Sequence, residues 1–171
     1  TGVSGYLGHH CAVELLKNGY LVKGSLRDLN KKNEVLDGIK KEIDPSNKLE
    51  FVKLDLLSDD SWDDAVKGCE YVLHVASPFS VREPNNEDEY IKPACEGTIR
   101  ALKSAQKAKV KRIVLTSSTV TMMGEIYDSK QDAGIVDAKS WTDPNSKNIN
   151  TYIKTKTLAE KAAWIFIENQ S

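Results

Sequence analysis

Strand-like and helix-like segments alternate along nearly the whole chain, and this alternation constrains the fold more than any other feature. Apolar runs typical of strands occupy residues 20–26, 49–54, 71–76 and 113–115, and the last two are apolar enough to be buried strands. Helical periodicity marks residues 9–18, 31–43, 89–107 and 150–167, and a short helix is expected to start near Ser58 or Ser61. This order is typical of a parallel sheet covered by helices on both faces, so we predict an α/β fold.

Chain length and charge narrow the possible partners. The 171 residues are enough to bury one sizeable core, so we expect a single domain over residues 1–171. Lys and Arg total 24 against 25 Asp and Glu, which leaves no global charge to attract nucleic acid or an anionic membrane. No apolar run approaches the roughly 20 residues that a bilayer crossing needs. Neither nucleic acid nor membrane is therefore expected as a partner.

The cysteines argue against a metal site and against a disulfide framework. Cys11, Cys69 and Cys95 are scattered and odd in number, and they show no spacing typical of metal ligands. We therefore expect no metal, and we expect the protein to work in the reducing cytoplasm.

Three spaced glycines open the chain and predict a phosphate site. Gly2, Gly5 and Gly8 stand directly before the first amphipathic helix. Glycines in this position allow a tight turn and close approach of a pyrophosphate to the unpaired N–H groups of the helix. Such a turn normally follows a buried strand, and no strand-like run precedes Thr1. We therefore expect the chain to be part of a larger one.

The residues that follow the predicted strand 20–26 bear on the choice between NAD and NADP as the dinucleotide. Arg27, with Lys31 and Lys32 nearby, follows the strand that reads the adenosine ribose in such sites. Arginine pairs with a 2′-phosphate, whereas an acidic residue accepts the 2′-hydroxyl of NAD. Arg27 favours NADP(H), although the adjacent Asp28 leaves NAD(H) possible.

The candidate catalytic residues lie in the second half of the chain. Ser118 follows a strand at the edge where open parallel sheets place ligands. Tyr152 and Lys156 are four residues apart, so on a helix they share one face. A phenol has a pKa near 10, and a neighbouring ammonium lowers it toward the range useful for proton transfer. This trio predicts acid–base chemistry at a substrate.

Several motifs together resemble one known family. They occupy residues 1–8, 24–28, 55–56, 74–79, 92–98, 115–118 and 152–156, in the family's order. The chain resembles the extended short-chain dehydrogenase/reductase family, and within it the group of dihydroflavonol, cinnamoyl-CoA and methylglyoxal or aldehyde reductases. The resemblance implies a Rossmann-type doubly wound parallel sheet with helices on both faces. It also implies that the first strand and a C-terminal substrate domain are missing.

The resemblance further implies a cofactor site and a role for each catalytic residue. Tyr152 would protonate a carbonyl oxygen as hydride arrives from the nicotinamide, Ser118 would hydrogen-bond that oxygen, and Lys156 would lower the phenol pKa and bind the ribose. The cofactor-binding residues that it implies are Gly2, Gly5, Tyr6, Leu7 and Gly8 at the pyrophosphate, Arg27 with Lys31 or Lys32 at the 2′-phosphate, Asp55 and Leu56 at the adenine, and Val75, Ala76 and Ser77 at the second ribose.

Two positions depart from related patterns and leave alternatives open. Ala94 stands where sugar-nucleotide epimerases carry Asn, and Met123 stands where plant dihydroflavonol reductases carry an amide. We therefore expect an NADPH-dependent carbonyl reductase for a small or apolar aldehyde or ketone. An NAD-dependent nucleotide-sugar epimerase or dehydratase and a non-catalytic NADP-binding sensor are the alternatives. A monomer and a homodimer built on the two long helices both remain open.

Overall fold

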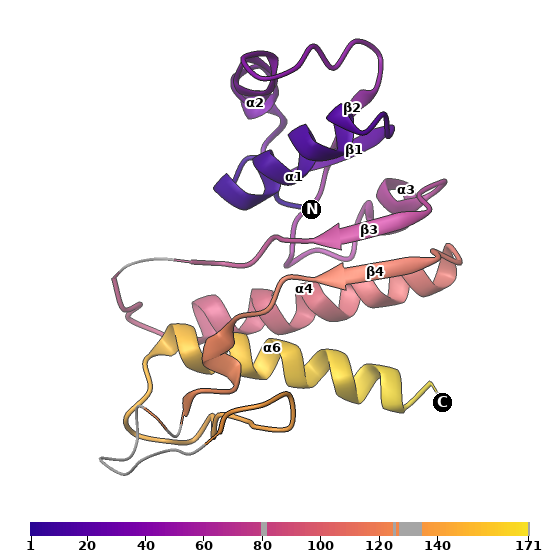
Figure 1. The fold of residues 1–171 in the computed structure, drawn as a ribbon. Helices are drawn as coiled ribbons and strands as arrows, with labels where there is room; N and C mark the ends of the chain where they lie inside the picture. Colours follow the sequence, from indigo (N-terminus) through magenta and orange to yellow (C-terminus); the bar gives the residue numbers. More distant parts are fainter. Residues whose placement is uncertain (80–81, 125, 127–134, 171) are drawn as a thin grey trace. The chain divides into compact units, whose positions relative to one another are not determined.

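The computed structural model describes residues 1–79, 82–124, 126 and 135–170, and it confirms the alternation of strands and helices (Figure 1). The strands are β1 (Val22–Leu26), β2 (Leu49–Lys53), β3 (Tyr71–His74) and β4 (Arg112–Leu115). The helices are α1 (Tyr6–Lys17), α2 (Lys32–Lys40), α3 (Trp62–Val66), α4 (Asp88–Lys107) and α6 (Thr151–Glu168), with short 3₁₀ helices η1 (Leu29–Lys31) and η2 (Thr119–Thr121).

Every strand pair that the structure describes is parallel, as predicted. β1 pairs with β2, and β3 pairs with β4, so the described strands form two two-stranded sheets and not one continuous sheet. The start of the chain lies between them, because Val3 N donates to Ser25 O at 3.2 Å and the Thr1 hydroxyl accepts from Ala76 N at 3.1 Å. A cavity of about 670 Å³ is lined by residues of both sheets and of α1.

The described residues group into two compact units. The first unit comprises residues 1–76 and 103–116, and the second comprises residues 77–102 and 117–171. The two sheets belong to the first unit, and α6 and η2 belong to the second. The predicted cofactor-binding residues up to Ala76 belong to the first unit, and Ser77, Ser118, Tyr152 and Lys156 belong to the second.

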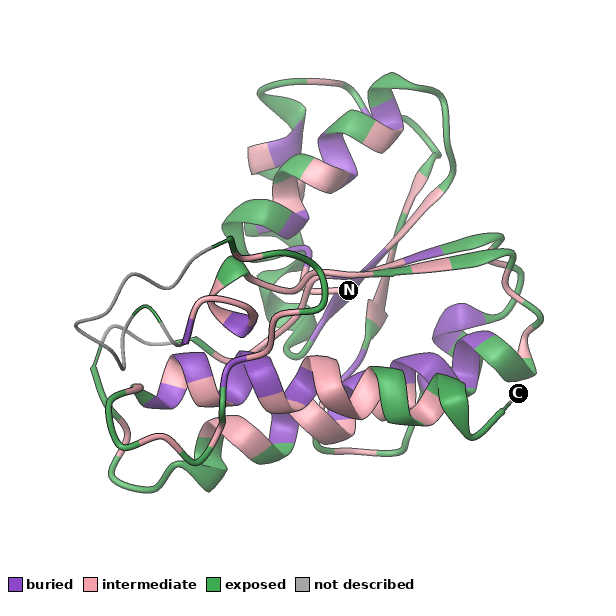
Figure 2. Ribbon diagram, turned by 60° about the horizontal axis from the view of Figure 1, so that its bottom comes forward, coloured by how far each residue is buried: buried purple, intermediate pink, exposed green. Residues whose placement is uncertain are grey.

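The core of the first unit is formed by α1, α2 and β1. Ala12, Val13 and Leu16 lie three or four residues apart, so they share the buried face of α1. They pack with Leu26 of β1 and with the fully buried Ile39 of α2. Figure 2 shows buried and exposed positions alternating along the helices, as amphipathic helices require.

β3 and β4 are less buried than their apolar sequences predict. In β3, Val72 and His74 are buried but Tyr71 is 52% exposed. In β4, Val114 is 49% exposed. The prediction of fully buried strands is wrong here, because each strand of this two-stranded sheet has only one described strand neighbour, which leaves part of its surface uncovered.

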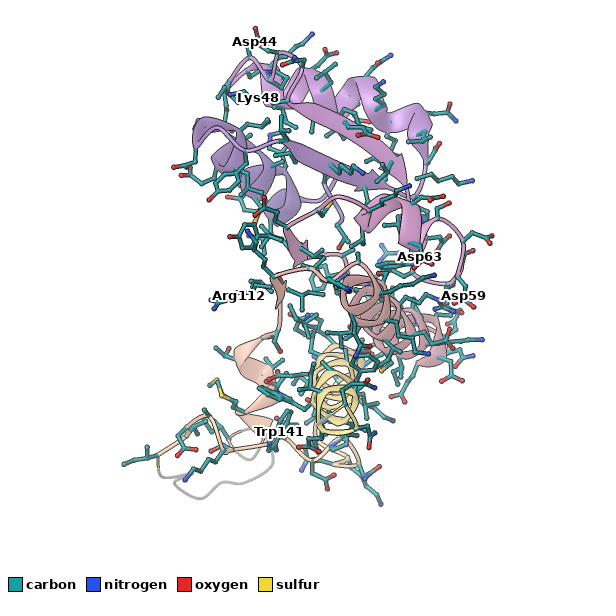
Figure 3. The ribbon with its side chains drawn as sticks, turned by 90° about the vertical axis from the view of Figure 1, so that its right-hand side faces the viewer. Asp44, Lys48, Asp59, Asp63, Arg112 and Trp141 are labelled. Carbon is teal, nitrogen blue, oxygen red and sulfur yellow. The ribbon has the colours of Figure 1, made fainter. Side chains whose placement is uncertain are left out.

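In the long polar stretch from Thr119 to Asn148, one buried threonine forms hydrogen bonds to the backbone about 20 residues before it. Residues 125 and 127–134 of it lie outside the described part of the chain. Thr142 is 0% exposed, accepts from Gly124 N at 2.7 Å and donates to Val120 O at 2.6 Å. Next to it, Trp141 packs under the Lys161 ammonium of α6, 5.4 Å from the ring centroid (Figure 3).

Candidate functional site

Two of the three N-terminal glycines are required by backbone contacts. Gly2 has φ +73°, and a Cβ there would lie 3.0 Å from the Cα of Ala76. A Cβ on Gly8 would lie 2.1 Å from the carbonyl oxygen of Gly2. Gly2 and Gly8 therefore let the turn, the first helix and the loop after β3 approach one another closely.

The third glycine leaves the N-terminus of α1 open. Gly5 is the N-cap and donates to Gly2 O at 3.0 Å. It offers no side chain to cap the helix, and the first turn contains no acidic residue. A Cβ on Gly5 would make one contact, with the carbonyl oxygen of Gly2 at 3.4 Å, so Gly5 is less closely packed than Gly2 and Gly8. Backbone N–H groups with a positive helix dipole are a suitable site for a phosphate.

Asp28 caps the short helix that follows β1. One oxygen of its carboxylate accepts from Asn30 N at 2.9 Å. Arg27, Lys31 and Lys32 are exposed around it, and Asp28 is exposed as well. Three basic side chains and one carboxylate are thus presented to solvent after β1.

The other residues of the first unit that the sequence predicts to bind the cofactor lie at the carboxyl ends of parallel strands. Leu26 and Lys53 are register partners, and Leu54 N donates to Leu26 O at 2.9 Å, so Arg27 and Asp55 emerge at the same edge. The Asp55 carboxylate accepts from Leu57 N at 2.9 Å. Listed by strand, the residues at these ends are Arg27 after β1, Asp55 and Leu56 after β2, and Val75 and Ala76 after β3.

The second unit presents Tyr152 and Lys156 on α6. Asn150 caps this helix by accepting from Ile153 N at 2.9 Å, which starts the helix directly before Tyr152. Tyr152 is half-buried, and the ring of Phe79 contacts it edge-on with centroids 5.4 Å apart. Lys156 follows one turn later and is only 7% exposed.

Burial has a direct electrostatic consequence for Lys156. Desolvation lowers the pKa of its ammonium, and the negative charge of Glu160 opposes this effect. A buried lysine beside a tyrosine is an uncommon arrangement for a structural helix, because lysine is seldom buried unless paired.

The two serines at the end of the fourth strand have different partners. Ser118 is the N-cap of η2, and its hydroxyl accepts from Val120 N at 3.4 Å. The η2 helix packs against α6. Ser117 donates its hydroxyl hydrogen bond directly to the carboxylate of Glu160 on α6. Ser77, the remaining cofactor-binding prediction, belongs to the same unit as Tyr152 and Lys156.

Two residues of this site were not singled out by the sequence. Glu160 lies four residues beyond Lys156, and this helical spacing is a signal that could have identified it. Phe79 is 73 positions from Tyr152, and no local pattern joins them. The contact of Phe79 with Tyr152 depends on tertiary packing.

The part of the chain that the structure describes offers neither a metal-binding cluster nor a membrane-spanning helix. Within the described ranges, no cluster of His, Cys, Asp and Glu could hold a metal ion. None of the helices in that part of the chain combines the length and apolar character that a membrane crossing requires.

Comparison with known proteins identifies the family. The sequence profile of the NAD dependent epimerase/dehydratase family matches residues 1–170. The chain belongs to this family. Its resemblance to extended short-chain dehydrogenases/reductases is thereby confirmed.

Similar members of the family are reductases. Dihydroflavonol 4-reductase of Arabidopsis thaliana is 38% identical over 181 residues, covering 99% of this chain and 45% of the relative. Cinnamoyl-CoA reductase CAD2 of Medicago truncatula is 37% identical over 176 residues, covering 100% and 53%. The chain thus spans about half the length of these relatives.

A solved structure supports the predicted fold. Yeast methylglyoxal/isovaleraldehyde reductase Gre2, determined in complex with NADPH, superposes with a TM-score of 0.84 at 27% identity. The match covers 99% of this chain and 52% of that protein. The chain is therefore part of a Rossmann-type α/β fold, as the alternation of its elements predicts.

Proposed function

We propose that this chain is the dinucleotide-binding portion of an NADPH-dependent carbonyl reductase and that it carries the catalytic residues. The observation that carries the proposal is the buried Lys156 one turn beyond the half-buried Tyr152 on α6. The reductase names of the relatives support the reaction class.

The first unit fits a dinucleotide. The uncapped start of α1 and the close backbone packing at Gly2 and Gly8 suit a pyrophosphate. Arg27, with Lys32, would hold the 2′-phosphate, because both side chains are exposed at the end of β1 and a guanidinium pairs well with phosphate. We therefore propose NADP(H) as the cofactor, in agreement with the NADPH bound to the yeast relative.

The second unit suits proton transfer to a carbonyl oxygen. NADPH, when bound, supplies the hydride that reduces the carbonyl carbon. Tyr152 donates its phenolic proton to the carbonyl oxygen, and Ser118 donates a hydrogen bond to the same oxygen as negative charge develops. The Lys156 ammonium stabilises the phenolate that remains. Phe79 restricts the tyrosine ring by its edge-on contact.

The substrate we propose is a small or apolar aldehyde or ketone. Met123 presents a thioether where the flavonoid reductases carry an amide, so it offers no strong hydrogen-bond partner to a polyphenol. Ala94 likewise departs from the epimerase pattern, which favours net reduction over epimerisation.

The test is a fluorescence titration of the protein with NADPH and with NADH. We expect tighter binding of NADPH, and we expect Arg27→Ala to abolish the preference. Lys147→Ala, which removes an exposed positive charge in the second unit, is the matched control and should leave it unchanged. A preference for NADH would refute the assignment of Arg27 and favour the epimerase alternative.

The reaction itself is tested by following NADPH oxidation with a panel of aldehydes and ketones. Tyr152→Phe should remove turnover and leave NADPH binding intact, because it deletes the transferable proton and keeps the ring. NADPH binding without turnover of any carbonyl compound would favour the sensor alternative.

A further inference from the structure

A carboxylate on α6 links the serine pair to the lysine of the candidate site. One oxygen of Glu160 accepts from the hydroxyl of Ser117. The other oxygen accepts from the indole nitrogen of Trp164 at 3.4 Å. Lys156, Glu160 and Trp164 follow one another at four-residue intervals, so they lie along one face of the helix. The carboxylate is thus held from both sides next to Lys156.

The charge of Glu160 matters because Lys156 is buried. An ammonium removed from water is destabilised relative to the neutral amine unless a negative charge compensates it. Glu160 is the carboxylate whose charge is felt by Lys156. The neighbouring lysines of α6 have other partners: Lys154 pairs with Glu87 at 2.6 Å, and Lys161 lies over Trp141.

We propose that Glu160 is a positioning residue that keeps Lys156 in its ammonium form and anchors the Ser117–Ser118 segment to α6. This inference rests on the proposed function, in which Lys156 must be charged and Ser118 must be held near the substrate oxygen. In this role Glu160 acts through Lys156 by charge and through Ser117 by a hydrogen bond.

The charge effect is tested directly on Lys156, without reference to turnover. The protein is labelled with lysine carrying ¹³C at Cε, and the NMR signal of Lys156 is identified by its loss in Lys156→Arg. We expect Glu160→Gln to move the titration midpoint of Lys156 to lower pH, because glutamine retains an acceptor for Ser117 and removes the charge. Glu168→Gln, an exposed position on the same helix, is the matched control and should leave the midpoint in place.

A second variant separates the charge of Glu160 from the side chain itself. Glu160→Asp keeps the carboxylate, so the Lys156 midpoint should stay closer to the parent value than it does in Glu160→Gln. An unchanged midpoint in a folded Glu160→Gln protein, or equal shifts in the two variants, overturns the proposal.

Turnover distinguishes the role of Glu160 from the function of the protein. We expect Glu160→Gln to lower kcat for carbonyl reduction and to shift its pH profile with the Lys156 midpoint, with little change in KM for NADPH. A shifted midpoint with unaltered kcat would overturn the positioning role. A shifted midpoint in a protein that never reduces a carbonyl would instead refute the proposed function and leave the Glu160–Lys156 coupling intact.

Discussion

Replacing Gly8 with alanine tests whether the glycine-rich turn is set by backbone packing. The added Cβ would lie 2.1 Å from the carbonyl oxygen of Gly2, about 0.9 Å inside the 3.0 Å limit that real Cβ contacts respect. The obstacle is backbone, so no side-chain rotation relieves it. Either α1 or the Gly2 carbonyl must move, and moving that carbonyl weakens its hydrogen bond from Gly5 N, now 3.0 Å long.

The magnitude follows from these contacts. Overpacking of this kind costs about 1–3 kcal/mol, and the weakened hydrogen bond adds about 0.5–1.5 kcal/mol. The higher helix propensity of alanine returns roughly 1 kcal/mol. We expect a net loss of about 2 kcal/mol, or a fall in Tm of about 4–8 °C for a chain of this size.

The assay is thermal unfolding followed by circular dichroism, with Gly38→Ala as the matched control. The three atoms nearest to a Cβ on Gly38, inside α2, would all belong to the His9 ring, the nearest being Cε1 at 2.9 Å, and that side chain can turn away. We expect its Tm to stay within about 2 °C of the parent value or to rise. Equal Tm values for the Gly8→Ala protein and the parent would refute the packing argument.

Three further predictions concern polar groups that are buried or partly buried. Thr142→Val keeps the shape but leaves the bonded groups of Gly124 and Val120 without their partner, so unfolding in urea should show a loss of about 2–4 kcal/mol, and Thr142→Ser should lose much less. Lys156→Met should stabilise the protein at neutral pH, because burial lowers the pKa of Lys156 in the folded state. This gain in stability should shrink as pH rises through the lowered pKa, where the parent lysine becomes neutral in the folded protein. An equal gain at about pH 7 and pH 10 would contradict this reasoning. Burial and the charge of Glu96 raise the pKa of the Cys95 thiol to about 11, so it should react with iodoacetamide more slowly than a free thiol at pH 8 until the protein is unfolded; a free-thiol rate in the folded state would contradict the burial.

Features that depend on local geometry could be read from the sequence. The alternation of strands and helices follows from hydrophobic periodicity, which reports backbone geometry over a few residues. The spacing of Gly2, Gly5 and Gly8 similarly indicated the turn before α1, and the interval from Tyr152 to Lys156 placed both on one helical face. The family resemblance rests on these same local motifs.

Features that depend on which segments meet in space were decided by tertiary structure alone. The sequence predicted one sheet with buried strands, whereas the described strands form two pairs and leave Val114 half exposed. It also could not show that Ser117 bonds Glu160, or that Phe79 contacts Tyr152. Periodicity identifies the apolar face of an element but not the element that covers it, because that depends on how distant parts of the chain pack.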